Sequence, residues 1–433
     1  MAALARSAHT YDARVLAMEV ACAMCPADVE AARASDASAR AGGAPADALT
    51  WAIDPPACVA GHAYAGSYAG RNIEKLYARG GLGGSLERAA RAVFAGDRRH
   101  ALVVSGFYVL HGFGGHGGGG GIAAGSCETD GPLGALAVVR ALAARGVRAS
   151  LYAERHNGPV LERAFAAMLA FYDASNPDFA AVLRANARVL PRESAPGGGG
   201  GEDRGALAAL TAADLRANVA AAWGADGAVP IDVLFAVERP SEPYGNIRGV
   251  DISEHTEAVD ALWPLGLELD AAGRAAAARA PDVAALRRAA GVAEDALSFG
   301  VGDGGNEVGM ANVVWKMPSL APAGFAPLSA NGAYRGCDHL LAATVSNWGG
   351  TALEAAAHVL GPKPAVPYVD VDAAVAVEAA VLSGIMENDC RAVDGKYHDR
   401  PNSVDGLAWD PYHRAFYTDL WTIATASATA APP

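Results

Sequence analysis

Four short apolar runs recur along the chain, at residues 101–104, 149–153, 231–237 and 297–301. Each is flanked by charged residues, glycine or proline, which is typical of a strand buried on both faces of a sheet. The runs alternate with alanine-rich segments whose apolar residues have helical spacing, such as 132–145. Strands that alternate with helices predict an α/β fold with a mostly parallel, doubly wound sheet and flanking Ala-rich helices.

The segments outside this alternation divide the chain. Residues 1–65 carry a helical pattern that ends in a proline-rich stretch, so we expect an N-terminal helical extension ahead of an α/β domain at 66–433. Within the domain, helical patterns at 72–77 and 85–93 precede the first strand.

Two glycine-rich tracts interrupt the domain, at 114–121 and 197–201. Neither has the spacing or the following lysine of a phosphate-binding loop. We therefore expect surface insertions without a fold of their own.

Composition narrows the class of protein. Hydrophobic residues make up 52% of the chain and aromatic residues only 7%, because alanine is abundant, and this indicates many helices. A formal net charge of −13 argues against nonspecific binding to nucleic acid or to anionic membranes. No apolar run is long enough to cross a bilayer, and six cysteines in 433 residues do not make a secreted disulfide framework. We expect a soluble protein whose partner is a small molecule; the oligomeric state stays open.

Acidic residues stand beyond the end of each predicted strand. Glu154 follows the second strand, Glu238 the third and Asp303 the fourth, whereas Asp130 lies between the first strand and a helix. Because the carboxyl ends of parallel strands share one edge of the sheet, these acids would converge on one cleft. Each acid alone could equally cap a helix or sit in a solvated turn, and Asp130, two residues before Pro132, fits an N-cap well.

Acids that share a cleft suit a hard cation with oxygen ligands, namely Mg²⁺ or Mn²⁺, with Ca²⁺ as a third option. The loop after the fourth strand supplies more such ligands among five glycines, and its Gly304 and Gly305 let the backbone bend closely around a substrate. The predicted metal ligands are Asp130, Glu238, Asp303, Asn306 and Glu307.

Two further segments offer groups that bind anions. Ser346 and Asn347 open a predicted helix whose free amide groups could hold a substrate carboxylate, although an N-cap beside a core tryptophan would look the same. Arg248 could bind a carboxylate or phosphate through both of its terminal nitrogens, and a surface arginine would look no different.

An ordered set of motifs is similar to the D-glutamate cyclase family over roughly residues 66–413. The motifs are Ser105-Gly106-Phe107-Tyr108, Glu128-Thr129-Asp130-Gly131-Pro132, Glu238-Arg239-Pro240, 246–251, 302–310, 345–350 and Ser403-Val404-Asp405-Gly406. Two departures concern loops that set specificity: the tract at 114–121 enlarges the loop before Glu128, and Pro243 with Tyr244 replaces the usual pattern after Glu-Arg-Pro.

The resemblance implies a carbon–oxygen lyase (a hydro-lyase) that converts D-glutamate to 5-oxo-D-proline and water. It also implies a location in the mitochondrial matrix or the cytoplasm, since the vertebrate enzyme resides in mitochondria. In that reaction a divalent ion on the acids would neutralise the reacting carboxylate, Arg248 could hold the other carboxylate, and the candidate general bases are Asp338, His339 and Glu154. The same acidic cleft would also suit a metal-dependent phosphohydrolase, or a non-catalytic metabolite-binding protein.

Overall fold

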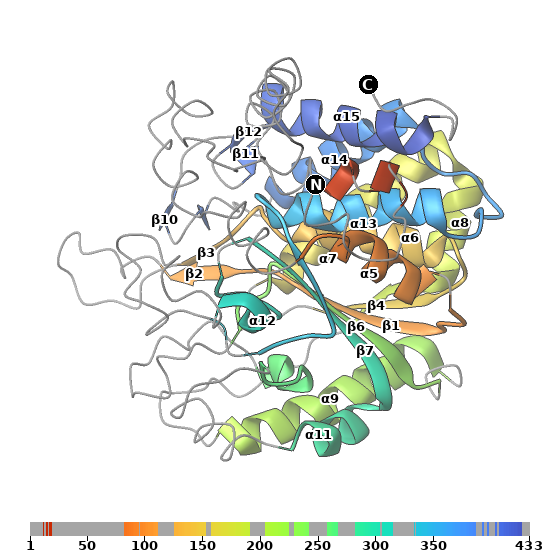
Figure 1. Cartoon of the computed structure of the whole chain (residues 1–433). Coiled ribbons are helices and arrows are strands. Elements are labelled where there is room, and N and C mark those ends of the chain that lie inside the picture. The colour runs from red at the N-terminus through yellow and green to blue at the C-terminus, as the bar shows by residue number, and fades with distance from the viewer. Residues whose placement is uncertain are drawn as a thin grey trace.

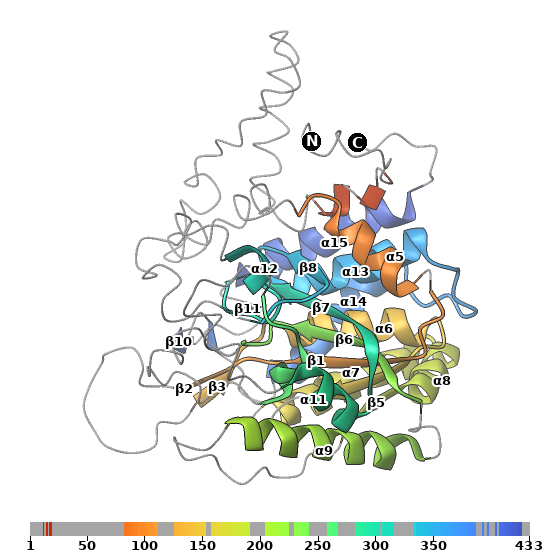
Figure 2. The same cartoon turned by 60° about the horizontal axis from the view of Figure 1, so that its bottom comes forward.

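The computed structural model is a three-layer arrangement with a parallel sheet between two sets of helices (Figures 1 and 2). The structure describes residues 12, 14–15, 17–19, 82–94, 96–110, 125–152, 157–190, 204–224, 229–241, 258–266, 282–303, 305–314, 333, 335–386, 392–393, 396–397, 403–404 and 407–426. Both predicted glycine-rich insertions and the predicted helix at 72–77 lie outside the described residues.

Six parallel strands form the sheet in the order β5-β4-β1-β6-β7-β8. Their bounds are β1 His100–Ser105, β4 Arg148–Tyr152, β5 Ala187–Val189, β6 Ile231–Val237, β7 Val292–Gly302 and β8 His339–Ala342. The four predicted strands are β1, β4, β6 and β7, which are the four inner strands, and their side chains are mostly buried. The predicted α/β class is therefore confirmed.

The helices cover the two faces of the sheet unequally. One face carries α5 Ser85–Phe94, α6 Pro132–Ala143, α7 Gly158–Ser175, α8 Pro177–Asn186, α13 Ser346–Leu360, α14 Val371–Met386 and α15 Arg414–Thr425. The other face carries α9 Arg204–Trp223, α11 Val283–Ala290 and the 3₁₀ helix η7 Ala258–Leu262. Each face buries its own apolar cluster: Val103 and Phe235 point into the larger one, and Leu102 and Leu234 into the smaller. This alternation follows from the two-residue period of a strand.

The short elements lie mainly beyond the carboxyl ends of the strands. They are the hairpin of β2 Tyr108–Leu110 and β3 Gly125–Cys127, the short helix α12 Ala311–Val314, the two-residue strand pairs β9 Ala392–Val393 with β10 Lys396–Tyr397 and β11 Ser403–Val404 with β12 Leu407–Ala408, and η8 Trp409–His413. Among the described helices, none is long and apolar enough to span a membrane.

The described residues of the N-terminal segment pack onto this domain. Val15 and Met18 lie in the larger apolar cluster. The carboxylate of Glu19 accepts hydrogen bonds from the amides of Gly84 (2.6 Å) and Leu86 (2.8 Å) at the start of α5. Residues far apart in sequence thus supply the cap that this helix start needs.

Helices α6 and α13 cross at two glycines, and this contact positions the functional site. A Cβ atom on Gly350 would lie 2.5 Å from the Cα atom of Gly134, and one on Gly134 would lie 2.8 Å from the Cα atom of Asn347. Real Cβ atoms do not approach so closely, so the two backbones touch only because side chains are absent. As a result, the N-termini of α6 and α13 meet just beyond the ends of β1 and β6.

Candidate metal centre

Three buried carboxylates meet beyond the carboxyl ends of the central strands. Asp130 precedes α6, Glu238 directly follows β6 and Asp303 directly follows β7. One carboxylate oxygen from each lies within 4.8 Å of the others. The predicted convergence of acids from separate strands is thus present for these three, which we call the acidic triad.

The N-terminus of α13 fixes the position of Asp130. Its Oδ1 accepts a hydrogen bond from the amide of Asn347 (2.8 Å), and its Oδ2 accepts one from the amide of Ser346 (2.8 Å). The positive end of the helix dipole therefore faces this carboxylate and favours its ionised form. We predicted that these backbone amides could bind a substrate carboxylate, but in the structure they donate their hydrogen bonds to Asp130.

The side chain of Asn347 in turn caps the N-terminus of α6. Its Oδ1 accepts hydrogen bonds from the amides of Gly131 (2.8 Å) and Gly134 (2.9 Å), and its Nδ2 donates to the carbonyl of Thr129 (3.1 Å). Asn347, which we predicted to bind substrate, thus holds the loop that carries Asp130 and supports the site indirectly.

Glu238 is strained and electrostatically crowded. Its φ of 44° is the only positive value among the non-glycine residues that the structure describes. Such a conformation is uncommon for a side chain with a Cβ atom and is concentrated at functional sites. Its Oε2 accepts a hydrogen bond from the hydroxyl of Ser346 (2.5 Å).

The pKa of Glu238 lies well above its ordinary range, because burial disfavours the charge and the nearby Glu307, Asp130 and Glu128 repel it. A cation among these carboxylates would remove both costs. Three oxygen donors from buried acids are also the ligand type that Mg²⁺, Mn²⁺ and Ca²⁺ prefer. The residues present therefore fit a hard divalent cation.

The other predicted ligands lie in the loop after β7, beside the triad. Glu307 is buried, and its Oε2 accepts a hydrogen bond from the amide of Gly305 (2.8 Å). Asn306 is held through its backbone, where its carbonyl accepts from the amide of Ser241 (2.8 Å). Glu307 adds negative charge near Glu238, and its predicted role as a further metal ligand stays a prediction.

Two arginines that we did not predict as site residues are buried in these loops. Arg239 follows Glu238, and its carbonyl accepts from the amide of Val308 (2.9 Å). Arg335 donates from Nη1 to the carbonyl of Trp263 (3.1 Å). The Glu238-Arg239-Pro240 motif was the available signal for Arg239, and no motif that we identified contains Arg335.

Asp338 and His339, predicted as candidate bases, are not brought to the triad. Oδ2 of Asp338 accepts hydrogen bonds from the amide (2.8 Å) and hydroxyl (2.7 Å) of Ser298, and the ring of His339 stacks on Phe299 at 4.8 Å. His339 begins β8, level with Phe299 and Phe235 of the neighbouring strands, whereas the triad lies beyond the carboxyl ends of the strands. Three residues of strand separate them, about 10 Å at the usual rise. Their role in joining β7 to β8 is structural.

Three more predicted site residues, Glu154, Arg248 and Gly304, lie outside the described residues.

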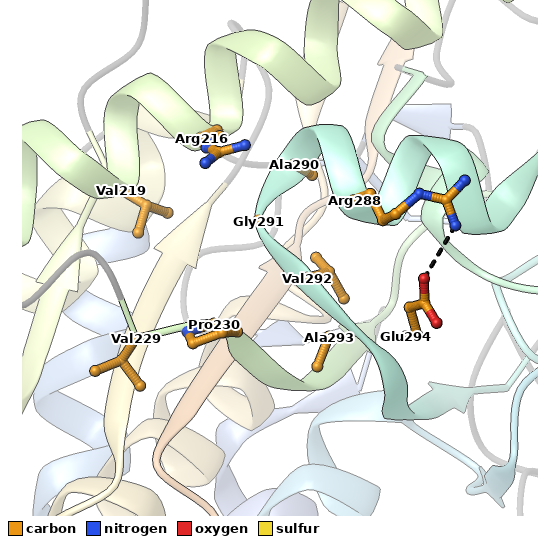
Figure 3. Close-up of a pocket in the computed structure, with 10 residues that line it drawn as sticks. All are labelled: Arg216, Val219, Val229, Pro230, Arg288, Ala290, Gly291, Val292, Ala293 and Glu294. Atoms are coloured by element: carbon orange, nitrogen blue, oxygen red, sulfur yellow. Dashed lines mark hydrogen bonds and ion pairs between the residues drawn. The ribbon is translucent and has the colours of Figure 1, made fainter.

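A separate hollow lies between α9, α11 and the starts of β6 and β7 (Figure 3). Arg216 and Arg288 stand at its rim, and Arg288 forms an exposed ion pair with Glu294 (3.1 Å). Pro230 and Val292 place this hollow at the amino ends of the strands. It is therefore distinct from the triad, which lies at the edge where α/β proteins bind their ligands.

Comparison with known protein families places most of the chain in one family model's matched range. A family model described as "D-glutamate cyclase-like, C-terminal" matches residues 63–275 and 271–421. The matched ranges include all three triad residues. No curated protein matches the sequence.

Proposed function

The chain belongs to the D-glutamate cyclase-like family, and we propose that it catalyses the dehydrating cyclisation of D-glutamate to 5-oxo-D-proline and water at the acidic triad. The observation that carries the proposal is the convergence of Asp130, Glu238 and Asp303 in a buried group at the ligand-binding edge of the sheet. By the same family relationship we propose a location in the mitochondrial matrix or the cytoplasm.

The reaction joins two groups of one substrate molecule. A bond forms between the α-nitrogen and the γ-carboxyl carbon, and one γ-oxygen leaves. The ammonium group of D-glutamate gives up two protons, and the departing oxygen takes up two to become water. The site must therefore bring the two ends of the substrate together, accept protons from nitrogen and deliver them to oxygen.

The triad residues would hold a divalent ion, with Mg²⁺ or Mn²⁺ as the proposed metals. Such an ion would supply positive charge that neutralises the γ-carboxylate and the negative charge that builds on its oxygens when the α-nitrogen attacks. The amides of α13 hold both oxygens of Asp130 in place, and the Ser346 hydroxyl holds one oxygen of Glu238. A preformed ligand set of this kind loses little freedom on binding its ion.

The buried residues around the triad would orient the two reacting groups of the substrate. A site that folds the substrate so that its nitrogen faces the γ-carbon gains the advantage of an intramolecular reaction, which amounts to about 7–11 kcal/mol in favourable cases. Of the three candidate bases, Asp338 and His339 stand at the far end of β8, so we retain Glu154, two residues after β4, as the proposed base. Arg248 remains the proposed ligand of the substrate's other carboxylate.

Direct assay separates this proposal from its alternatives. Purified protein would be incubated with D-glutamate, L-glutamate, D-glutamine and a generic phosphate ester, with and without Mg²⁺ or Mn²⁺. The proposal expects 5-oxo-D-proline from D-glutamate alone, and only with metal. Phosphate release without 5-oxoproline would indicate a metal-dependent phosphohydrolase. Binding of D-glutamate with neither product would indicate a metabolite-binding protein.

A further inference from the structure

Ser105 is a buried residue beside the acidic triad to which we have so far given no role. It is the last residue of β1, and it pairs in register with Val237, the residue before Glu238. Its side chain is completely buried. Its motif, Ser105-Gly106, lies at the carboxyl edge of the sheet, beside the end of β6 that leads to Glu238.

The hydroxyl of Ser105 stands in the wall of the triad. A Cβ atom built on Gly131 would lie 2.9 Å from Oγ of Ser105 and 2.8 Å from Cβ of Glu238. The hydroxyl of Ser105 and the side chain of Glu238 therefore both border Gly131, the residue after Asp130. Gly131 also has a φ of 100°, a backbone conformation that favours glycine, and glycine has no side chain to separate Ser105 from Glu238.

No hydrogen-bond partner for this hydroxyl is present among the described residues. A buried hydroxyl without a partner is unfavourable for folding, and native proteins leave few of them. A buried serine on the neighbouring strand shows the usual outcome: Oγ of Ser150 bonds to Nε2 of His100 (2.8 Å) and to Nε1 of Trp223 (2.9 Å). Folding alone therefore explains Ser150 but not Ser105.

The ligand chemistry follows from what surrounds Ser105. The carboxylates of the triad do not accept its proton, whereas Glu238 accepts one from Ser346. Neighbouring ligands of one small cation lie about 3 Å apart, a separation at which a hydroxyl beside a carboxylate would normally donate to it. Ser105 is thus better placed as a donor to an incoming molecule than as another ion ligand.

We propose that Ser105 is a substrate-binding residue whose hydroxyl donates a hydrogen bond to a carboxylate oxygen of the substrate. The inference rests on the proposed function, because a dicarboxylate entering a group of acids needs donors for the charge that the ion does not neutralise. A hydrogen bond to a charged group in a buried site is among the stronger ones.

The test compares Ser105→Ala with Ser150→Ala, two buried serines on neighbouring strands. Calorimetric titration would measure Mn²⁺ affinity and then the affinity of the Mn²⁺-loaded protein for 5-oxo-D-proline, which keeps only the α-carboxylate. Steady-state kinetics would give KM for D-glutamate, or titration its Kd if no turnover occurs. Thermal unfolding would report stability.

For Ser105→Ala we expect an affinity for D-glutamate about tenfold lower or more, Mn²⁺ affinity within about twofold of wild type, and an equal or higher Tm. If the affinity for 5-oxo-D-proline falls as well, Ser105 donates to the α-carboxylate. If only the affinity for D-glutamate falls, Ser105 donates to the γ-carboxylate. Ser150→Ala should lower Tm and leave ligand affinity unchanged.

Unchanged D-glutamate affinity in Ser105→Ala would overturn the inference, and so would an equal fall in Mn²⁺ affinity, which would make Ser105 an ion ligand. Wild-type protein that binds D-glutamate without forming product, with binding weakened in Ser105→Ala, would support the role of Ser105 and refute the cyclase. Wild-type protein that does not bind D-glutamate would refute both.

Discussion

Asp130 and Asn347 cap each other's helices. The carboxylate of Asp130, just before α6, accepts from the amides of Ser346 and Asn347 at the start of α13. The carboxamide of Asn347 accepts from the amides of Gly131 and Gly134 at the start of α6. This exchange places a triad carboxylate at two helix N-termini, where its charge is favoured.

Asn347→Ala should therefore damage both stability and metal binding. Losing the cap should cost about 1–2 kcal/mol of unfolding free energy, and freeing the Asp130 loop should weaken Mn²⁺ affinity by about 10–100-fold. Chemical denaturation and calorimetric titration would measure the two effects.

Asn176→Ala provides the matched control, because Asn176 caps α8 by accepting from the amide of Phe179 (3.1 Å) away from the triad. It should lose similar stability with no change in Mn²⁺ affinity. Equal Mn²⁺ affinity in both variants would mean that the reciprocal cap does not position Asp130.

Asp303→Asn should abolish Mn²⁺ binding and turnover while the fold remains intact, since a carboxamide keeps the shape but not the charge of the ligand. Asp338→Asn is the comparison, because Asp338 bonds to Ser298 in the middle of β7, away from the triad. Circular dichroism would establish folding in both. If Asp338→Asn, well folded, were the inactive variant, the placement of the active site would be wrong.

Gly350→Ala should force α6 and α13 apart, because the added Cβ atom would lie 2.5 Å from the Cα atom of Gly134. Overpacking of this kind costs about 1–3 kcal/mol, and Mn²⁺ affinity should fall with it because both helix N-termini move. Gly96→Ala has room for its methyl group, with a nearest neighbour at 3.6 Å, and should change neither quantity. Wild-type stability in Gly350→Ala would show that the crossing is not tight.

The helix layer predicts a dependence of stability on pH. Arg140 of α6 donates to both oxygens of Glu354 on α13 (2.9 and 2.7 Å) and also to Glu378 on α14, and all three side chains are buried. Burial raises the pKa of Glu378 to about 7; the charge of Glu354 adds to the rise and Arg140 opposes it. Tyr172 and Tyr368 face the same group.

Because this pKa is above the ordinary value of 4.5, the folded protein holds the proton more tightly than the unfolded chain. The stabilisation is complete below pH 4.5 and is lost as pH rises to about 7, at up to about 1.4 kcal/mol per pH unit. Glu378→Gln cannot titrate, so its unfolding free energy should fall less steeply from pH 5 to 7 than that of wild type. Parallel curves would show that Glu378 keeps an ordinary pKa.

The sequence predicted the parts of this protein that depend on local pattern. The inner strands β1, β4, β6 and β7 each contain a short, mostly apolar run, and the edge rule for parallel sheets was enough to gather Asp130, Glu238 and Asp303. The edge strands β5 and β8 were missed because they are three and four residues long and begin beside charged or polar residues.

The long-range contacts that position the site residues could not be predicted from the sequence. Asp130 and Asn347 are 217 residues apart, so no spacing rule connects them, and the amides that looked open to substrate proved to be occupied. Asp338 and His339 looked catalytic because acid and imidazole are adjacent in sequence, but the register of β8 places them about one strand length short of the carboxyl edge that carries the triad.

Metal dependence gives a simple functional check. Removal of divalent ions with EDTA should suppress turnover of D-glutamate, and Mg²⁺ or Mn²⁺ should restore it, because three buried carboxylates lose their shared counter-charge. Full turnover after verified metal removal would refute the proposed chemistry.

The most direct test of the account is anomalous diffraction from a crystal grown or soaked with Mn²⁺. The account predicts one strong peak about 2.0–2.3 Å from a carboxylate oxygen of each of Asp130, Glu238 and Asp303. A well-ordered site without a peak between these three carboxylates, or with the peak elsewhere, would contradict it.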